Sequence, residues 1–200
     1  MSSANVTWEA ARVNRTVRWA ALGQHGATVW ITGLPAAGKS TLAATLERRL
    51  VEAGRWAYRL DGDNMRHGLC GDLGFARCDR EANVARVGEV ARLFADAGVV
   101  ALVSLVSPYA ECRARVREAH EGEGLAFLEV FVNTPGAECE RRDPKGLYAR
   151  ARAGEISGLT GVDDPYEPPV APDVEVTPGS DPETAAEAVL EALDARLQQA

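Results

Sequence analysis

A glycine-rich stretch, GLPAAGKST at residues 33–41, restricts the fold of this chain more than any other feature. Gly33 is followed by four residues and then by Gly38-Lys39-Ser40, which is the complete P-loop pattern. Glycines allow the backbone to approach an anion closely and to direct several N–H groups at it. A helix that follows adds its positive N-terminal end. The pattern therefore predicts a phosphate-binding loop between a strand and a helix.

Both flanks of this loop have the sequence that such a loop requires. Residues 27–32, ATVWIT, predict a short buried strand. After the loop, Leu42, Leu46 and Leu50 recur every four residues, as apolar residues do on one face of a helix. A chance glycine-rich turn would not need either flank, so the context favours a true P-loop.

Two polar residues of the loop carry the chemistry of such a site. In a P-loop, the lysine reaches the β- and γ-phosphates of the nucleotide and the serine hydroxyl binds the metal ion. We therefore expect Lys39 to contact ATP and Ser40 to bind Mg²⁺.

Apolar strand-like segments alternate with helical segments along the rest of the chain. Strands are expected at about 27–32, 56–60, 99–105 and 127–132, and the clearest helix at about 79–97, with Gly98 ending it. Strands that are apolar throughout and alternate with helices predict a parallel sheet covered on both sides. The expected fold class is therefore α/β, a P-loop NTPase-type parallel sheet flanked by helices.

The length of the chain, 200 residues, suits one α/β domain with a sizeable core, and we expect a single domain over residues 1–200. Its expected parts are a polar lead-in with some helix (1–25), a basic helix and glycine-rich loop (141–164), a proline-rich extended wrap (165–182) and a final helix (183–198). Basic residues followed by glycines suit a mobile lid over phosphates. A solvated charged helix is the alternative for that segment.

Composition excludes some classes of partner. The net charge of −7 argues against a general nucleic-acid surface, so an anion site must be a local basic patch. The four cysteines show neither a CxxC pair nor zinc spacing, which indicates reduced thiols in a cytoplasmic protein. The longest apolar run, VVALVSLV at 99–106, is too short to span a bilayer. We expect no nucleic-acid partner and no membrane.

A second group of polar residues is expected close to the P-loop. In a parallel sheet, ligands bind beyond the carboxyl ends of the strands. LDGDNMRHGL (60–69), SLVSPY (104–109) and the basic segment lie there. One of Asp61 and Asp63 could accept a proton from an attacking hydroxyl and the other could bind Mg²⁺ through water, while Arg66 would contact an anionic acceptor. Asp and Asn also favour turns, so DGDN alone leaves a purely structural role open.

With these stretches in place, the chain resembles the adenylylsulfate kinase (APS kinase) family, which phosphorylates the 3′-hydroxyl of adenosine 5′-phosphosulfate (APS) with ATP. The resemblance runs from about residue 26 to 170. It is carried by the P-loop and by LDGDNMRHGL, DLGF, VGEVARLFADAGVV, SPY, EVFVNTP and RDPKGLYARARAGEISGLTGVDDPYEPP, in family order. It implies ATP and Mg²⁺ as cofactors, a small-molecule nucleotide as acceptor, a place in sulfate assimilation and a homodimer.

The resemblance also implies a role for each matching position. Asp61, Lys39 and Ser107 form the expected catalytic set, with Asp61 as general base, and Asp63 joins Ser40 near the metal. The ATP-binding residues would be Gly33, Ala36, Ala37, Gly38, Lys39, Ser40, Thr41 and Arg142. The acceptor-binding residues would be Asp61, Asp63, Arg66, Cys70, Phe75, Arg80, Asn83, Val106, Ser107, Lys145 and Leu159, with Phe75 stacked on the adenine of APS.

Ser107 matches a serine that is often described in the family as a phosphoserine intermediate. A loose phosphoryl-transfer state needs alignment and charge stabilisation, and the P-loop, Mg²⁺ and Lys39 already supply both. We therefore expect direct in-line transfer and an acceptor-binding role for Ser107.

Several residues depart from the family pattern. Pro35-Ala36 stands where the family usually has a pair such as Ser-Gly, Cys70 where an Asn is common, and Leu105 and Leu159 where Phe is usual. Losing one stacking aromatic could weaken base binding by about 1–3 kcal/mol. The departures fit neutral change within APS kinases. They also fit a relative that phosphorylates the ribose of another 5′-modified nucleotide, such as a cytidine nucleotide.

Two further classes stay open. A P-loop ATPase switch would need a water-positioning residue, and the strand expected at 99–105 ends in Ser104 rather than in a Walker-B aspartate. A nucleotide-binding module without catalysis would not need Lys39, Ser40 and Asp61 together. Both classes are therefore weaker alternatives than a small-molecule kinase.

Overall fold

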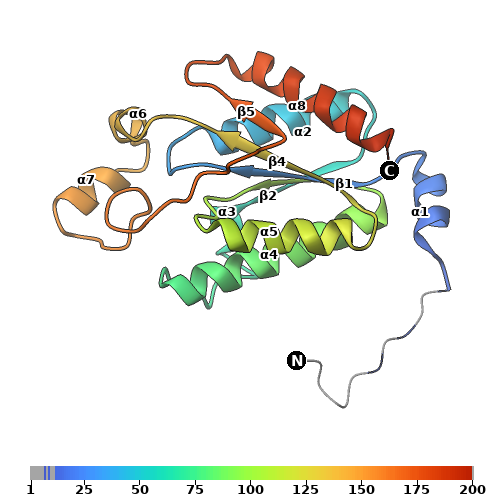
Figure 1. Ribbon diagram of the computed structural model, residues 1–200, viewed down its shortest axis with the longest axis horizontal. Coiled ribbons are helices and arrows are strands. Elements are labelled where there is room, and N and C mark those ends of the chain that lie inside the picture. The colour runs from blue at the N-terminus through green and yellow to red at the C-terminus, as the bar shows by residue number, and fades with distance from the viewer. Residues whose placement is uncertain (1–6, 8, 10–11, 200) are drawn as a thin grey trace.

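Five parallel strands form the centre of the molecule, in the spatial order β2-β3-β1-β4-β5 (Figure 1). The computed structural model describes residues 7, 9 and 12–199. The strands are β1 (Ala27–Thr32), β2 (Ala57–Asp61), β3 (Val100–Ser104), β4 (Ala126–Val132) and β5 (Val174–Val176). The predicted α/β class with a parallel sheet is confirmed.

Helices cover both faces of the sheet. In chain order they are α1 (Arg15–Leu22), α2 (Lys39–Glu52), α3 (Gly62–Met65), α4 (Arg77–Ala97), α5 (Ala110–Glu121), α6 (Gly136–Arg142), α7 (Leu147–Arg152) and α8 (Pro182–Leu197). Figure 1 shows α2 and α8 on one face and α4 and α5 on the other, with α6 and α7 projecting beyond one end of the sheet. No described helix is long and apolar enough to cross a membrane.

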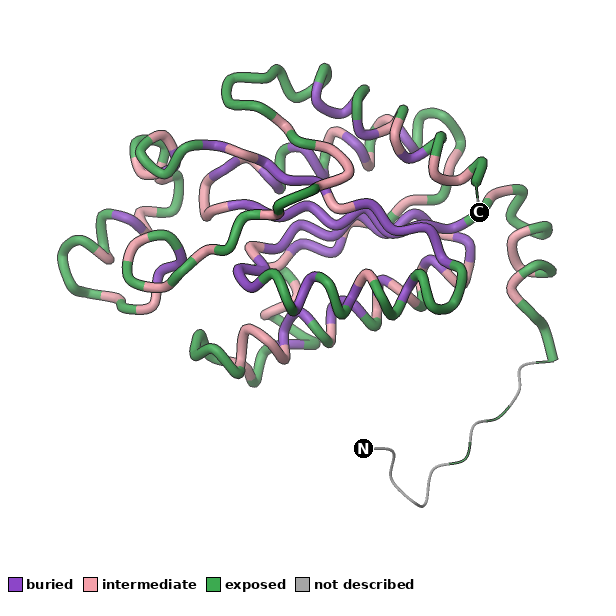
Figure 2. The backbone as a smooth tube through the Cα atoms, in the orientation of Figure 1, coloured by how far each residue is buried: buried purple, intermediate pink, exposed green. Residues whose placement is uncertain are grey.

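The central strands are buried at every position because both of their faces are covered, as Figure 2 shows. Side chains alternate along β1. Val29 and Ile31 join the apolar cluster under α2 and α8, and Trp30 joins the cluster under α4 and α5. This double burial explains the continuous apolar runs in the sequence.

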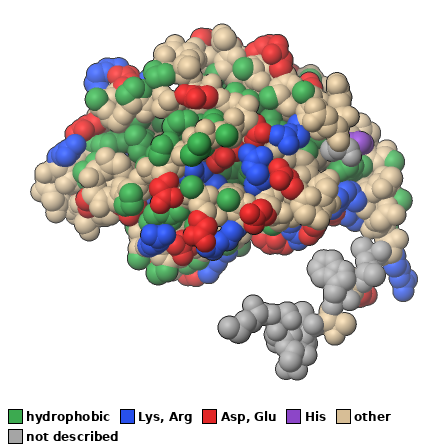
Figure 3. Space-filling model, in the orientation of Figure 1, with side chains coloured by type: hydrophobic (Ala, Val, Ile, Leu, Met, Phe, Trp, Pro, Cys, Tyr) green, Lys and Arg blue, Asp and Glu red, His purple; other side chains and the backbone are tan. Residues whose placement is uncertain are grey.

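On the face of the molecule covered by α5, basic and acidic side chains form ion pairs and do not gather into separate positive and negative patches. Figure 3 shows basic and acidic side chains next to one another over this face. Arg115 pairs with Glu111, and Arg117 pairs with Glu121 at 3.3 Å, both along α5. Such exposed pairs contribute little to stability.

The structure differs from the expected elements in two places. The segment 165–182, expected to be extended throughout, contains the three-residue edge strand β5, which the prolines around it concealed. The basic helix expected from residue 141 is two helices, α6 and α7. Asp143 has a φ of 23° and Pro144 cannot continue a helix, so the chain turns between α6 and α7. The expected lead-in contains α1, and residues 1–6, 8 and 10–11 of it lie outside the described residues.

The strands end at a common edge, where the expected ligand-binding stretches begin. Ser104 at the end of β3 is in register with Asp61 of β2 and Ile31 of β1, and Thr32 is in register with Phe131 of β4. The loops after β1, β2 and β3 therefore lie beside one another at this edge.

Candidate active site

The P-loop has the geometry of an anion-binding turn. Gly33 has a φ of 150°, and a Cβ at this position would lie 2.7 Å from the carbonyl oxygen of Val132, so only glycine fits. Gly38, with a φ of 113°, starts α2 and offers no side-chain cap to the free N–H groups of the first turn. These N–H groups and the helix dipole remain available for a phosphate.

Lys39 lies buried inside the loop. Its Nζ donates to the carbonyl oxygens of Gly33 at 2.9 Å and Leu34 at 2.7 Å. Burial lowers the pKa of Lys39 to about 8. An anion in the loop would favour the charged ammonium and offset that burial. A phosphate bound in the loop would therefore keep Lys39 charged.

Asp61, at the end of β2, is held by three hydrogen bonds. Its Oδ2 accepts from the hydroxyl of Ser40 at 2.7 Å and of Ser104 at 3.0 Å, and its Oδ1 accepts from the backbone N–H of Asp63 at 3.1 Å. Burial alone raises the pKa of Asp61. The three hydrogen bonds and the Arg59 guanidinium outweigh burial and leave this pKa below its usual value. The carboxyl group is therefore ionised at neutral pH, next to the P-loop serine.

The residues expected at the metal fit a magnesium ion bound with phosphates. Ser40 is exposed at the start of α2, and its hydroxyl lies against the Asp61 carboxylate. Asp63 is exposed and pairs with Lys145. Within the described part of the chain, no three His, Cys, Asp or Glu side chains gather as a metal site. Mg²⁺ commonly keeps few protein ligands and shares phosphate oxygens, so these hard oxygen groups suit it.

An exposed aromatic ring between two arginines marks the expected acceptor side. Phe75 is 62% exposed, and the guanidinium carbons of Arg66 and Arg80 lie 4.3 Å and 5.7 Å from its ring centre. Arg66 donates to the carbonyl oxygens of Leu73 and Gly74, both at 3.0 Å, which fixes its direction. A flat ring beside two cations suits a planar ligand that carries negative charge.

Asn83, on α4, is buried with one polar atom unsatisfied. The residue is 4% exposed, and its Nδ2 finds no hydrogen-bond partner among the described residues. A buried amide without a partner is costly, so such a group calls for an explanation. A ligand acceptor at this point would supply the missing partner.

The loop after β3, residues 104–108, carries a strained serine. Ser107 is 3% exposed and has a φ of 40°. Its hydroxyl accepts from Nε1 of Trp30 and donates to Oγ1 of Thr32, both at 3.1 Å. The Thr32 hydroxyl in turn donates to the carbonyl oxygen of Val106 at 2.7 Å. The Ser107 hydroxyl is therefore engaged with the protein interior, and Val106 is half-buried beside it.

The basic segment meets the P-loop and the acceptor side. Arg142 approaches the carbonyl oxygen of Ala37 at 3.4 Å, and Tyr148 donates to the carbonyl oxygen of Pro35 at 3.1 Å. Arg80 donates to the carbonyl oxygen of Gly158. The segment therefore contacts both the P-loop and Arg80 of the expected acceptor side.

The structure brings together most of the predicted site residues at this edge of the sheet. Three of the residues that depart from the family pattern instead lie in packed regions. Cys70 and Leu105 belong to the apolar cluster under α4 and α5, and Leu159 belongs to the cluster under α2 and α8. Cys70 has no exposed surface, so a ligand could reach it only after a movement. Thr41 lies exposed in the first turn of α2.

Sequence reasoning did not find Thr32, Trp30 and Ser104 as site residues. Ser104 begins the stretch 104–109 that is expected at the ligand-binding edge, but the sequence assigns it no role of its own. Each lies on a buried strand, where its sequence neighbours are apolar and no local motif marks it. Their positions near strand ends could have been the signal, because such ends point into the ligand edge.

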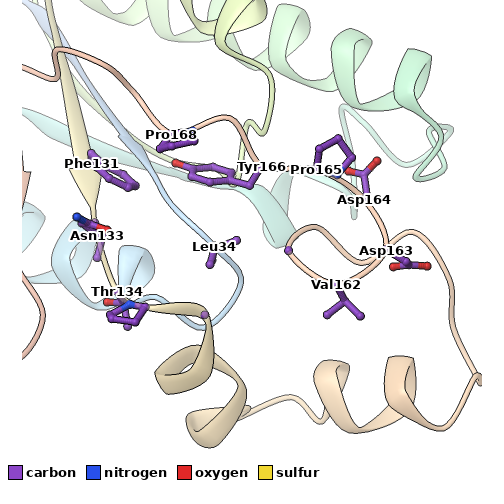
Figure 4. A pocket seen from close by; sticks show the side chains of 14 residues that line it. Leu34, Phe131, Asn133, Thr134, Val162, Asp163, Asp164, Pro165, Tyr166 and Pro168 are labelled. Atoms are coloured by element: carbon purple, nitrogen blue, oxygen red, sulfur yellow. The ribbon is translucent and has the colours of Figure 1, made fainter.

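A separate hollow of about 580 Å³ lies beside the P-loop (Figure 4). Leu34, Phe131 and Thr134 line one side, and Asp164 and Tyr166 line the other. Leu34 of the P-loop and residues 161–164 of the expected lid line this hollow, although none of the individually predicted ATP- or acceptor-binding residues does.

Comparison with known proteins agrees with the geometry. The family model for adenylylsulphate kinase matches residues 25–177. The adenylyl-sulfate kinase of Citrobacter koseri is 55% identical over 170 residues, which cover 85% of this chain and 84% of that protein. Adenylyl-sulfate kinase 3 of Arabidopsis thaliana is 51% identical over 175 residues, which cover 88% of this chain and 83% of that protein. The structure of the Mycobacterium tuberculosis APS kinase CysC in complex with AMPPNP and APS superposes with a TM-score of 0.83 at 51% identity, covering 86% of this chain and 99% of that one. The chain therefore belongs to the adenylylsulphate kinase family.

Proposed function

We propose that this protein is a kinase that transfers the γ-phosphoryl group of ATP to the 3′-hydroxyl of APS, giving 3′-phosphoadenosine 5′-phosphosulfate in sulfate assimilation. The observation that carries the proposal is the Asp61 carboxylate, which lies 2.7 Å from the hydroxyl of the P-loop residue Ser40. A carboxylate that could act as a general base thus lies next to the P-loop. Similarity to enzymes named adenylyl-sulfate kinase, and to one structure described with APS, supports APS as the acceptor.

On the donor side, the chain binds and neutralises the triphosphate. The free N–H groups at the start of α2 and the Lys39 ammonium would hold the β- and γ-phosphates, and Arg142 would lie over the nucleotide. Ser40, with Asp63 nearby, would hold Mg²⁺. When bound, Mg²⁺ neutralises charge on the phosphate oxygens.

On the acceptor side, the chain orients a sugar hydroxyl and takes its proton. Arg66, Arg80 and Asn83 would bind the phosphosulfate and ribose, and Phe75 would stack on the base. Asp61, ionised at neutral pH, would accept the proton as the 3′-oxygen forms its bond to the γ-phosphorus and the bond from that phosphorus to ADP breaks. Lys145, paired with Asp63, would close this side.

We propose that the transfer is direct. The Ser107 hydroxyl is buried and already bonded to Trp30 and Thr32, which disfavours its use as a phosphoryl carrier. Its supported role is to shape the acceptor side through the loop 104–108.

The departures from the family pattern give no support to a different acceptor base. Cys70, Leu105 and Leu159 are all buried among apolar side chains, so none adds an exposed hydrogen-bonding group that could select another base. The proposed acceptor therefore stays APS.

Several broader features belong to the same proposal. The chain would act as one kinase domain in which residues 141–164 close over both nucleotides. A homodimer is consistent with the exposed apolar side chains Val51, Trp56, Tyr58 and Leu93 near the free edge of the sheet at β2. The four free cysteines suit a reducing, cytoplasmic setting.

The test is acceptor-dependent release of ADP. The protein is incubated with ATP and Mg²⁺, alone and with a panel of 5′-nucleotide anhydrides that includes APS and a cytidine analogue, and the products are identified by phosphorus NMR. We expect ADP release with APS only and a new 3′-phosphate in the product. ADP release without acceptor would indicate an ATPase, and preference for the cytidine analogue would indicate a changed acceptor.

A further inference from the structure

One buried arginine outside the predicted site uses all three of its side-chain nitrogens to bond other parts of the chain. Arg113, on α5, is 3% exposed. Its Nη1 donates to the carbonyl oxygen of Ser107, its Nη2 to the carbonyl oxygen of Glu167, and its Nε to Oε1 of Glu129, each at 2.7 Å. A single side chain thus joins the loop 104–108, strand β4 and the strap, which we define as residues 165–172, after the basic segment and before β5.

Further hydrogen bonds fasten the strap to the loop, to the first residue of α5 and to the end of β1. The backbone N–H of Glu167 donates to the carbonyl oxygen of Pro108 at 2.8 Å, and the Glu167 side chain accepts from the backbone N–H of Ala110 at 2.7 Å. Tyr166 lies 3.1 Å from the Thr32 hydroxyl, oxygen to oxygen. Loop and strap are therefore one bonded unit, with Arg113 at its centre.

Ser107 needs such support. A non-glycine residue with a φ of 40° is strained and persists only where its surroundings hold it. Trp30 and Thr32 hold its side chain, while Arg113 holds its carbonyl group. Removing Arg113 leaves the backbone of the loop without its charged donor.

The ion pair between Arg113 and Glu129 is weak evidence for stability in itself. Desolvation of two buried charges can cancel their attraction, so we take the role of this pair to be the fixing of one arrangement rather than stabilisation. Arg117 provides a comparison on the same helix. It approaches Glu129 at 3.8 Å and binds Asp173 at 2.6 Å, but it bonds neither the loop nor the carbonyl of Glu167.

We propose that Arg113 is a positioning residue for acceptor binding: its guanidinium fork sets the loop 104–108 and the strap in the arrangement that receives the acceptor nucleotide. The expected effect on binding of APS rests on the proposed function. The expected ordering of the loop and the strap is a structural effect that does not depend on the proposed function.

The kinetic test compares Arg113→Met and Arg113→Lys with the matched control Arg117→Met in the full chain. Losing a charged donor of this kind raises KM for APS by about tenfold or more. KM for ATP stays within about twofold, because the P-loop does not contact Arg113. Lysine keeps the charge beside Glu129, so Arg113→Lys retains the fold, but one ammonium cannot reach both carbonyls and KM for APS still rises.

The proposal is overturned if KM for APS is unchanged in both Arg113 variants, if KM for ATP rises equally, or if Arg117→Met has the same effect. Hydrogen exchange supplies a readout without activity. Amides in 104–110 and 164–168 should exchange faster in both Arg113 variants and at the wild-type rate in Arg117→Met. If wild-type protein does not phosphorylate APS, the proposed function fails, and the exchange result alone decides whether Arg113 orders the loop and strap.

Discussion

The P-loop and the loop 104–108 are neighbouring turns that are held in different ways. Both follow central strands, and each contains a non-glycine residue with positive φ, Ala36 at 62° and Ser107 at 40°. In the P-loop, bonds within the loop itself form the turn, and Thr134 and Tyr148 add bonds to its carbonyl oxygens from distant positions. The backbone N–H of Ala37 donates to the carbonyl oxygen of Leu34, and Lys39 bonds to carbonyls five and six residues before it.

The loop 104–108 depends instead on distant residues. Trp30 and Thr32 bond to Ser107 across 77 and 75 residues of sequence, and Arg113 reaches it from the next helix. A turn that is held locally leaves a motif in the sequence, whereas a turn that is held by the fold does not. The difference explains why the donor side could be predicted from a short pattern and the support of the acceptor side could not.

Removing Lys39 should give the largest effect, because it takes away the one buried cation of the P-loop that would neutralise the transferred group. We expect Lys39→Ala to lower kcat by on the order of 10⁴-fold, as for other cations that stabilise charge in phosphoryl transfer. The measurement is steady-state ADP release with APS, alongside circular dichroism to show that the fold is retained. Turnover that survives within about tenfold of wild type would show that the loop is not the catalytic phosphate site.

Asp61 joins the two regions, since it accepts from Ser40 on one side and from Ser104 on the other. Asp61→Asn keeps the size of the side chain but removes the base, so kcat should fall by about 10²–10⁴-fold. Nucleotide affinity, measured by titration with a non-hydrolysable ATP analogue, should change little. Equal losses in kcat and in nucleotide affinity would assign Asp61 a structural role instead.

The sequence predicted the positions of the four longer strands along the chain, the P-loop, the carboxylates Asp61 and Asp63, and Arg66. Each of these leaves a local pattern in the sequence, which is the periodicity of the apolar residues, the spacing of a motif or the position of a glycine. It did not predict β5, because three residues between prolines carry no strand signal. It did not single out Arg113, which stands in AECRARVREAHE beside two exposed or half-buried arginines of similar sequence context. Only the packing of α5 shows which of the three is buried.

Ser107 tests whether the second region takes part in chemistry or only in shape. If the transfer is direct, Ser107→Ala should lower kcat by less than about tenfold, since no bond to phosphorus is lost. A phosphoserine carrier would lose its activity completely in this variant. The measurement is kcat with saturating ATP and APS, with intact-protein mass spectrometry during turnover as a second check for a phosphorylated wild-type chain.

A pair of glycine substitutions sharpens the comparison with the smallest effects. Glycine relieves the strain of a positive φ, worth about 1–2 kcal/mol, but it increases the entropy of the unfolded chain by about 0.4–1 kcal/mol. In Ala36→Gly, relief of strain and the entropy of the unfolded chain are the main effects, because the methyl group of Ala36 makes no hydrogen bond. The free energy of unfolding should therefore stay level or rise by less than about 1 kcal/mol.

In Ser107→Gly, the relief of strain is opposed by the loss of two buried hydrogen bonds, which also leaves the Trp30 N–H unpaired. The free energy of unfolding should therefore fall by about 1–2 kcal/mol. Urea unfolding of both variants measures the difference. A loss in Ala36→Gly as large as that in Ser107→Gly would show that the P-loop is not a locally determined turn after all.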